Sequence, residues 1–239
     1  MKLSIFGDSF ADEKFFKESY KSQGLSWIDH IKQTNLYSID NFSERGASLW
    51  WCYQQFLTHQ QNYDKIIFLV TFPNRITLPD TTKLTIRRHQ QPYNVELHLQ
   101  FADDTTRGQY KLIQDYYDNI HDRDRELFFH DTLVEKIQAL RPDAILYPCS
   151  RRSMLNNLDL PLLEIMQYED ETWGGFDMSY RNQGRDDTRM CHMIEENNEL
   201  VGQLFLKKLS GINNILTVNH LYKPKKLRDH YLTSVKWGT

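Results

Sequence analysis

The sequence predicts one α/β domain, a three-layer α/β/α sandwich with a mainly parallel, flavodoxin-like sheet of about five strands. Short runs rich in strand formers alternate with longer stretches whose apolar residues recur at helical spacing. Residues 66–70 form an uninterrupted apolar run, which is typical of a parallel strand buried on both faces. Strands that alternate with helices favour a parallel sheet covered on both sides.

The elements follow in a regular order along the chain. Strands are expected at 2–6, 36–39, 66–70, 144–147 and 160–166. Helices are expected at 24–31, from 46 onward, at about 107–121 and 122–140, and at 195–209. The helix before 144 should end at Arg141, because Pro142 cannot continue it.

Two segments do not follow this alternation of strands and helices. In residues 80–106 apolar side chains fall at alternate positions around a Gln-Gln-Pro centre, which predicts a hairpin insertion. Residues 211–239 carry a basic and aromatic C-terminal extension. We therefore expect a main domain over 1–210, with its insertion at about 80–106, and an extension over 211–239.

Composition excludes several classes of protein. With 40% hydrophobic and 26% charged residues the chain resembles ordinary globular proteins, and its net charge of -3 argues against a nucleic-acid binder. No apolar run is long enough to span a membrane, and no signal peptide is visible, so we expect a cytoplasmic protein or one delivered by another route. The three cysteines, Cys52, Cys149 and Cys191, lack the spacing of a disulfide framework or a zinc site. No metal or cofactor is expected, and the oligomeric state stays open.

Residues near the carboxyl ends of parallel strands are the first candidates for function, because ligands bind there in open α/β sheets. Ser9 follows the first strand directly after Gly7 and Asp8, and Gly46 follows the second strand. Asn74 follows the third strand, and His192 lies just before the last helix. Taken alone, each of these residues also fits an ordinary turn, helix cap or surface position.

Together, in this order, the four residues and their loops resemble the SGNH/GDSL hydrolase family over residues 1 to about 210. The resemblance implies that Ser9 is the nucleophile and His192 the general base. It also implies that Gly46 and Asn74 supply oxyanion donors beside the Ser9 N–H, and Asp8 is grouped with these substrate-binding residues.

Two positions differ from the family pattern. The third block normally reads Gly-x-Asn-Asp, and here residues 72–75 read Phe-Pro-Asn-Arg. The family aspartate usually lies three residues before the histidine, where this chain has Arg189. We take Asp187 as its substitute, with Asp186 as the second choice. A Ser-His dyad oriented by a backbone carbonyl stays open.

The resulting hypothesis is a serine esterase acting on short acyl or O-acetyl groups of a carbohydrate or another polar substrate. Four aromatic residues lie in or near predicted loops or helix starts: Trp50, Trp51, Trp173 and Phe176. Exposed aromatics there could stack on sugar rings, and core packing is the expected role for at least half of the four. A lipid or lysophospholipid esterase is one alternative, and an inactive binding or structural protein with the same fold is another. A flavodoxin-like nucleotide or flavin binder would need a phosphate loop richer in glycine than the one around Gly7.

Overall fold

The computed structural model describes residues 1–13, 25–78, 86, 88–90, 92–149, 159, 161–162, 165, 193 and 195–221. The chain divides into two compact units. The first unit comprises Met1–Asp12 and Leu36–Asn157, and the second comprises Glu13–Asn35 and Leu158–Thr239. Each unit is described below by itself.

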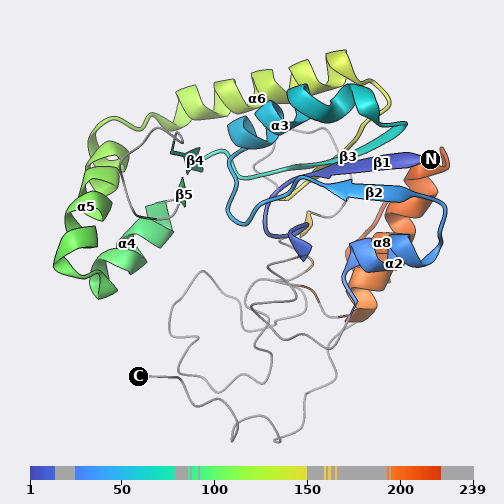
Figure 1. Ribbon diagram of the computed structural model, residues 1–239, viewed down its shortest axis with the longest axis horizontal. Helices are drawn as coiled ribbons and strands as arrows, with labels where there is room; N and C mark the ends of the chain where they lie inside the picture. Colours follow the sequence, from blue (N-terminus) through green and yellow to red (C-terminus); the bar gives the residue numbers. More distant parts are fainter. Residues whose placement is uncertain are drawn as a thin grey trace, which may run out of the picture. The chain divides into compact units, whose positions relative to one another are not determined.

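The first unit is built on a parallel sheet (Figure 1). Its described strands are β1 (Lys2–Phe6), β2 (Ser38–Asn41), β3 (Lys65–Val70) and β6 (Ile145–Pro148), in the spatial order β2-β1-β3-β6. All three pairings are parallel. Counted along the chain, this is the order 2-1-3-4 of flavodoxin-like sheets, so the predicted fold class is confirmed.

The central strand β3 is buried on both faces. Ile66, Phe68 and Val70 point to one side, Ile67 and Leu69 point to the other, and none of them is exposed to solvent. A strand of this kind needs cover on both sides of the sheet, as the predicted three-layer arrangement requires.

Two helices of the first unit pack on the same face of this sheet, α3 (Leu49–His59) and α6 (Arg123–Leu140) (Figure 1). Their apolar side chains share one core cluster with the sheet, in which Phe6, Phe56 and Phe68 lie with ring centroids 5.8 to 5.9 Å apart. The short helix η1 (Gln60–Asn62) follows α3. Of the helices that the structure describes, none is both long and apolar enough to cross a membrane.

The insertion combines a small antiparallel ribbon with two helices. β4 (Ile76–Thr77) pairs with β5 (His89–Gln90), and the helices α4 (Pro92–Phe101) and α5 (Asp104–Asn119) follow, lying beside the ribbon in Figure 1. The hairpin expected over 80–106 is therefore wrong over Pro92–Phe101, which is a helix. Val95, Leu99 and Ala102 recur at helical spacing as well, and they pack with Tyr110 and Ile113 of α5 in a separate cluster. Pro92 suits the first turn of α4, where its missing N–H is not needed.

The expected fifth strand at 160–166 is also wrong. Within this stretch Leu162 and Ile165 are helical, and the Ile165 N–H donates a hydrogen bond to the Pro161 carbonyl at 3.2 Å. That bond spans four residues, as in an α-helix. A short apolar run does not distinguish a strand from a buried helical turn by periodicity alone.

The second unit contains α2 (Trp27–Gln33), α8 (Glu195–Leu209) and the short helix η3 (Val218–His220). Ser26 and Asp29 form a capping box at the start of α2. α2 and α8 pack closely, with the Trp27 and Phe205 rings 4.7 Å apart, and a Cβ added at Gly202 would lie 3.0 Å from the Trp27 carbonyl oxygen. The predicted boundary at 210/211 stays a prediction, and residues 222–239 of the extension lie outside the described residues.

Candidate active site

The candidate nucleophile lies in a tight turn at the carboxyl end of β1. The Asp8 carbonyl accepts hydrogen bonds from the N–H groups of Ala11 and Asp12 at 3.0 and 3.1 Å. The Asp8 Oδ1 accepts a further one from the Phe10 N–H at 3.1 Å. The chain therefore leaves the strand directly into a helical turn, and Ser9 is the second residue of that turn. Ser9 is half-buried, and no hydrogen bond of its hydroxyl is recorded among the described residues.

Gly7 is required at the start of this turn because the neighbouring strand is too close for a side chain. A Cβ at this position would lie 2.8 Å from the Leu69 Cβ on β3. The Gly7 carbonyl accepts hydrogen bonds from the Glu44 N–H at 3.2 Å and from the Cys52 thiol at 3.4 Å. The Ser9 turn is thus joined to the loop that carries Gly46.

Further hydrogen bonds join the same two segments. The Asn41 Nδ2 donates to the Ala11 carbonyl at 2.6 Å, and the Arg45 N–H donates to the Asp12 carboxylate at 3.0 Å. Both bonds connect the loop after β2 with the turn after β1. The structure therefore brings together two of the loops that the sequence singled out, those of Ser9 and Gly46.

The Gly46 loop is a turn that needs glycine. The Ala47 N–H donates to the Glu44 carbonyl at 3.0 Å, and Gly46 has a φ of 77°. A positive φ at the third residue of a four-residue turn is typical of type II, where side chains are disfavoured. A glycine leaves the backbone N–H groups here accessible to a close ligand.

Asn74 lies in the turn after β3 and is half-buried. The hydrogen bond recorded at this residue is at its backbone, where the carbonyl accepts from the Tyr117 hydroxyl at 3.2 Å. No contact of its side-chain amide with the Ser9 or Gly46 loops is recorded among the described residues. The oxyanion role of Asn74 therefore stays a prediction.

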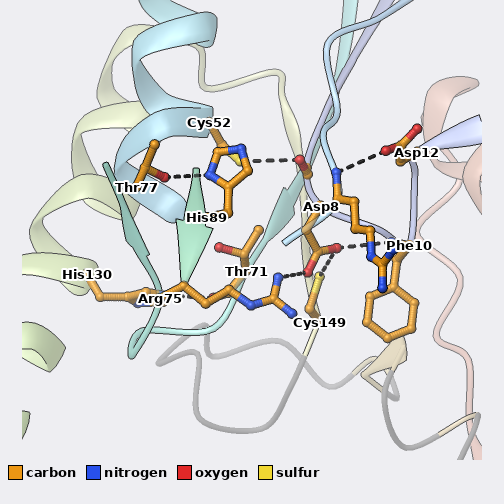
Figure 2. A network of polar contacts seen from close by, with 12 residues as sticks. Asp8, Phe10, Asp12, Cys52, Thr71, Arg75, Thr77, His89, His130 and Cys149 are labelled. Carbon is orange, nitrogen blue, oxygen red and sulfur yellow. Dashed lines mark hydrogen bonds and ion pairs between the residues drawn. The ribbon is translucent and has the colours of Figure 1, made fainter. Parts of the chain in front are cut away.

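Arg75, next to Asn74, forms an ion pair with the fully buried carboxylate of Asp8 (Figure 2). The Arg75 guanidinium also lies over the Phe72 ring, 4.5 Å from its centroid. The Cys149 thiol lies 3.8 Å from the Asp8 Oδ1. Both carboxylate oxygens of Asp8 are engaged by the protein, beside the nucleophile rather than at it.

The two cysteines of this region are not candidates for nucleophilic chemistry. Cys52 and Cys149 are fully buried, and no disulfide bond joins them. Burial raises the pKa of both thiols well above the usual value, and the negative charge of Asp8 raises it further. Both therefore stay protonated and unreactive at neutral pH.

Sequence reasoning missed a second polar cluster, which contains His89 of β5 (Figure 2). Its Nδ1 lies 2.8 Å from the Thr77 hydroxyl, and its Nε2 lies 3.0 Å from the Glu44 carboxylate. The Ser48 hydroxyl lies 2.6 Å from that of Thr77. No motif marks His89, because its partners Glu44 and Thr77 come from two other segments, which meet His89 only in the folded chain.

Burial lowers the pKa of His89, and this effect exceeds the opposing influence of the Glu44 carboxylate. The imidazole is therefore neutral at neutral pH. Its Nδ1 contacts the Thr77 hydroxyl, which in turn contacts the Ser48 hydroxyl, so the ring takes part in a network of hydrogen bonds.

The remaining predicted site residues, His192, Asp187 and Asp186, lie outside the described residues, as do Trp173 and Phe176. Of the two other aromatics, Trp51 is buried in the core beside His89, with ring centroids 5.4 Å apart. Trp50 is partly exposed and contacts Phe129 at 5.7 Å. Within the described ranges no group of three or more His, Cys, Asp or Glu side chains is placed to hold a metal ion.

The fold and this arrangement define the class of protein: an α/β protein with a flavodoxin-like parallel sheet, whose first strand ends in a Gly-Asp-Ser turn joined to a glycine-containing loop. No protein-family model matches the chain, and no curated protein matches it in sequence.

Among solved structures, the chain is similar to a protein from Desulfitobacterium hafniense DCB-2 that is assigned to the G-D-S-L family of lipolytic proteins. The identity is 12%, the TM-score is 0.33, and the match covers 87% of this chain and 99% of that one. It is also similar to an acetyl xylan esterase, AlAXEase, with 12% identity, a TM-score of 0.37 and coverage of 87% and 98%. Similarity at this level does not assign a reaction to this chain.

Proposed function

We propose that this chain is a serine esterase in which Ser9 is the nucleophile and His192 the general base. The observation that carries the proposal is the connection between the Ser9 turn and the Gly46 loop at the carboxyl end of the inner strand β1. Functional groups of open α/β sheets gather at this edge. Ser9 itself is half-buried in the turn at this edge.

The chemistry follows from these parts. A serine hydroxyl becomes a useful nucleophile only when a base accepts its proton, and an imidazole with a pKa of about 6.5 suits this task near neutral pH. In the proposal His192 takes the proton from Ser9 during attack on the ester carbonyl and returns it to the leaving alcohol. Asp187 is our choice for the group that orients the imidazole, and Asp186 is the second.

Negative charge develops on the carbonyl oxygen during the attack. We assign its stabilisation to the N–H groups of Ser9 and Gly46 and to the Asn74 amide. Loss of one such donor typically raises the barrier by about 3 to 4 kcal/mol. The carboxylate of Asp8 is buried and already paired, so in the proposal it holds the turn of the nucleophile and does not bind the substrate directly.

The substrate we propose is a short acyl or O-acetyl ester of a carbohydrate or of another polar alcohol. The residues that flank the candidate site in the sequence include Phe10, Glu44, Arg45 and Arg75, a mixed polar and aromatic set that favours a small acyl unit in a polar setting. A lipid or lysophospholipid ester is the alternative substrate, and a protein that keeps the fold without catalysis is the alternative function.

The test uses a fluorophosphonate probe, which forms a covalent bond with activated serines, followed by mass spectrometry of the labelled peptide. Label on Ser9, lost in Ser9→Ala and kept in Ser38→Ala, supports the esterase. Ser38 is a suitable control because it is exposed on the edge strand β2. Label on a different residue contradicts the assignment of the nucleophile, and a protein that neither reacts with the probe nor hydrolyses esters supports the inactive alternative.

A further inference from the structure

We propose that the insertion takes part in catalysis indirectly: Thr77 of β4 and His89 of β5 are positioning residues that hold the Gly46 loop in the shape of an oxyanion donor. This inference rests on the proposed function, because it assigns a role to residues around Gly46. It assigns a role to the insertion, whose strands β4 and β5 are not part of the parallel sheet.

The contacts run in one unbroken chain around the loop. The Glu44 carboxylate lies at 3.0 Å from the His89 Nε2, the His89 Nδ1 at 2.8 Å from the Thr77 hydroxyl, and the Thr77 hydroxyl at 2.6 Å from that of Ser48. Glu44 and Ser48 are the two ends of the loop whose third residue is Gly46. Both ends of the loop therefore contact the same two-stranded ribbon.

The ribbon also packs against the loop directly. A Cβ added at Gly46 would meet the His89 Cβ at 3.4 Å, so the imidazole stem lies against the glycine backbone. The other side of the His89 ring meets the edge of Trp51 in α3, 5.4 Å between centroids and 75° between planes. His89 is thus enclosed by the loop and the first turn of the helix that follows it.

One order of donors gives each of the two hydroxyls both a donor and an acceptor role. The Ser48 hydroxyl accepts the N-capping hydrogen bond from the Trp51 N–H at 3.3 Å, and in this order it donates its own proton to Thr77. The Thr77 hydroxyl can then donate to the His89 Nδ1 and leave the proton of the neutral ring on Nε2, facing the Glu44 carboxylate. Each hydroxyl then both donates and accepts, whereas the His89 Nε2 lies 3.0 Å from the Glu44 carboxylate without the geometry of a hydrogen bond.

This arrangement matters for a reaction because oxyanion donors act through preorganisation. A backbone N–H stabilises a developing negative charge only when it is already fixed at hydrogen-bond distance from that oxygen. A loop with a positive φ at Gly46 has other conformations open to it, since glycine adopts many. Anchors at both ends of the loop, at Glu44 and Ser48, restrict it to one of them.

The experiment compares Thr77→Val with Thr77→Ser. Valine keeps the shape of threonine and removes the hydroxyl, whereas serine keeps the hydroxyl. Thr132→Val is the matched control, because the Thr132 hydroxyl donates within α6 to the Phe128 carbonyl at 2.9 Å and has no part in the loop. Two quantities are measured for each variant: the kcat and KM for p-nitrophenyl acetate, and the hydrogen-exchange rates of the Gly46 and Ala47 amides by NMR.

Misplacement of a catalytic group by about 1 Å costs about 100-fold in rate, so we expect Thr77→Val to lower kcat about 10- to 100-fold with little change in KM. The Gly46 and Ala47 amides should exchange faster, while amides of β1 and β3 keep their rates. Thr77→Ser should recover most of the kcat, and Thr132→Val should match the wild type in both readouts.

The outcomes separate this inference from the proposed function. An active wild type whose Thr77→Val variant keeps its kcat and its exchange rates overturns the inference and leaves the esterase standing. A wild type without esterase activity and without label on Ser9 overturns the catalytic role of the loop together with the esterase. In that case faster exchange at Gly46 in Thr77→Val would still support the structural half of the inference, that the ribbon holds the loop.

Discussion

The carboxylate of Asp8 and the guanidinium of Arg75 form an ion pair from which solvent is almost excluded: the Asp8 side chain is 0% exposed and that of Arg75 is 8% exposed. Asp8 comes from the turn after β1, and Arg75 comes from the turn after β3. The pair therefore ties together two neighbouring loops at the carboxyl edge of the sheet. In the segment 72–75, which resembles the third SGNH/GDSL motif, Arg75 stands where the family has aspartate. The family pattern therefore does not include this ion pair.

Arg75→Met should destabilise the protein by about 3 to 5 kcal/mol, because it leaves the Asp8 carboxylate buried without its partner. The double variant Asp8→Asn with Arg75→Met should lose less than Arg75→Met alone, since it removes the uncompensated charge. Urea unfolding followed by circular dichroism measures both. Equal loss in the single and double variants would show that the pair is not coupled.

Gly7→Ala should destabilise by about 1 to 3 kcal/mol, because the new methyl group would meet the Leu69 Cβ at 2.8 Å in the centre of the sheet. Gly108→Ala is the matched control. Gly108 is exposed in α5 with no atom within 4 Å of an added Cβ, so this change should stabilise the helix by about 0.5 to 1 kcal/mol. Thermal unfolding of the two variants should therefore shift in opposite directions.

The stability of the wild type should fall between pH 7 and pH 5 by more than that of His89→Gln. Burial lowers the pKa of His89 in the folded protein, so the unfolded state, with a histidine pKa of about 6.5, takes up the proton first as the pH falls. Below that value the unfolded state binds more protons, and the free energy of unfolding decreases until the folded pKa is passed.

The charged groups that act on His89 are Glu44, Arg88 and Arg75. His89→Gln removes the imidazole and leaves these three groups in place. The difference between the two proteins in their urea midpoints at pH 7 and pH 5 therefore reports on His89. Parallel pH profiles for wild type and His89→Gln would contradict a buried neutral imidazole.

The thiols of Cys52 and Cys149 should resist alkylation by iodoacetamide at pH 8 in the native protein and react once it is unfolded in urea. Both are fully buried, and burial raises their pKa. Mass spectrometry of the separate peptides distinguishes them from Cys191. Native alkylation of either thiol at the rate seen in urea would show that the core around Asp8 opens readily.

The specificity constants for p-nitrophenyl esters should fall from acetate or butyrate toward longer acyl chains. Each buried methylene contributes about 0.8 kcal/mol only when apolar wall surrounds it. The flanking residues that the sequence singles out, Phe10, Glu44, Arg45 and Arg75 among them, offer little such wall. A steady rise through octanoate to palmitate would favour the lipid esterase instead.

Much of the fold could be predicted because its elements are marked locally. The apolar run at β3 and the capping residues of α2 and α6 leave little ambiguity about type or position. The error in α4 has a physical cause: Val95 and Leu99 are spaced for both alternation and a helical face, and the contact with Tyr110 and Ile113 decides for the helix.

The site could be predicted only in part. Ser9 and Gly46 follow strands that are neighbours in the sheet, and the rule that functional loops meet at one sheet edge brings them together. His89 could not be found in this way, because it belongs to a two-residue strand of the insertion. Its contacts with Glu44 and Thr77 depend on how the ribbon folds over the loop, which no local pattern records.

The order of the strands also has a consequence for how the chain folds. Leu3 pairs with Lys65 and Ile67 pairs with Ile145, so the sheet assembles only when segments far apart in sequence meet. Contacts of this range slow folding, and we expect times of milliseconds to seconds for the sheet and not microseconds. The entropy of loop closure grows slowly, by about 0.6 kcal/mol for each doubling of loop length. The chain can therefore carry the whole segment from β4 to α5 between two paired strands at little thermodynamic cost to the sheet.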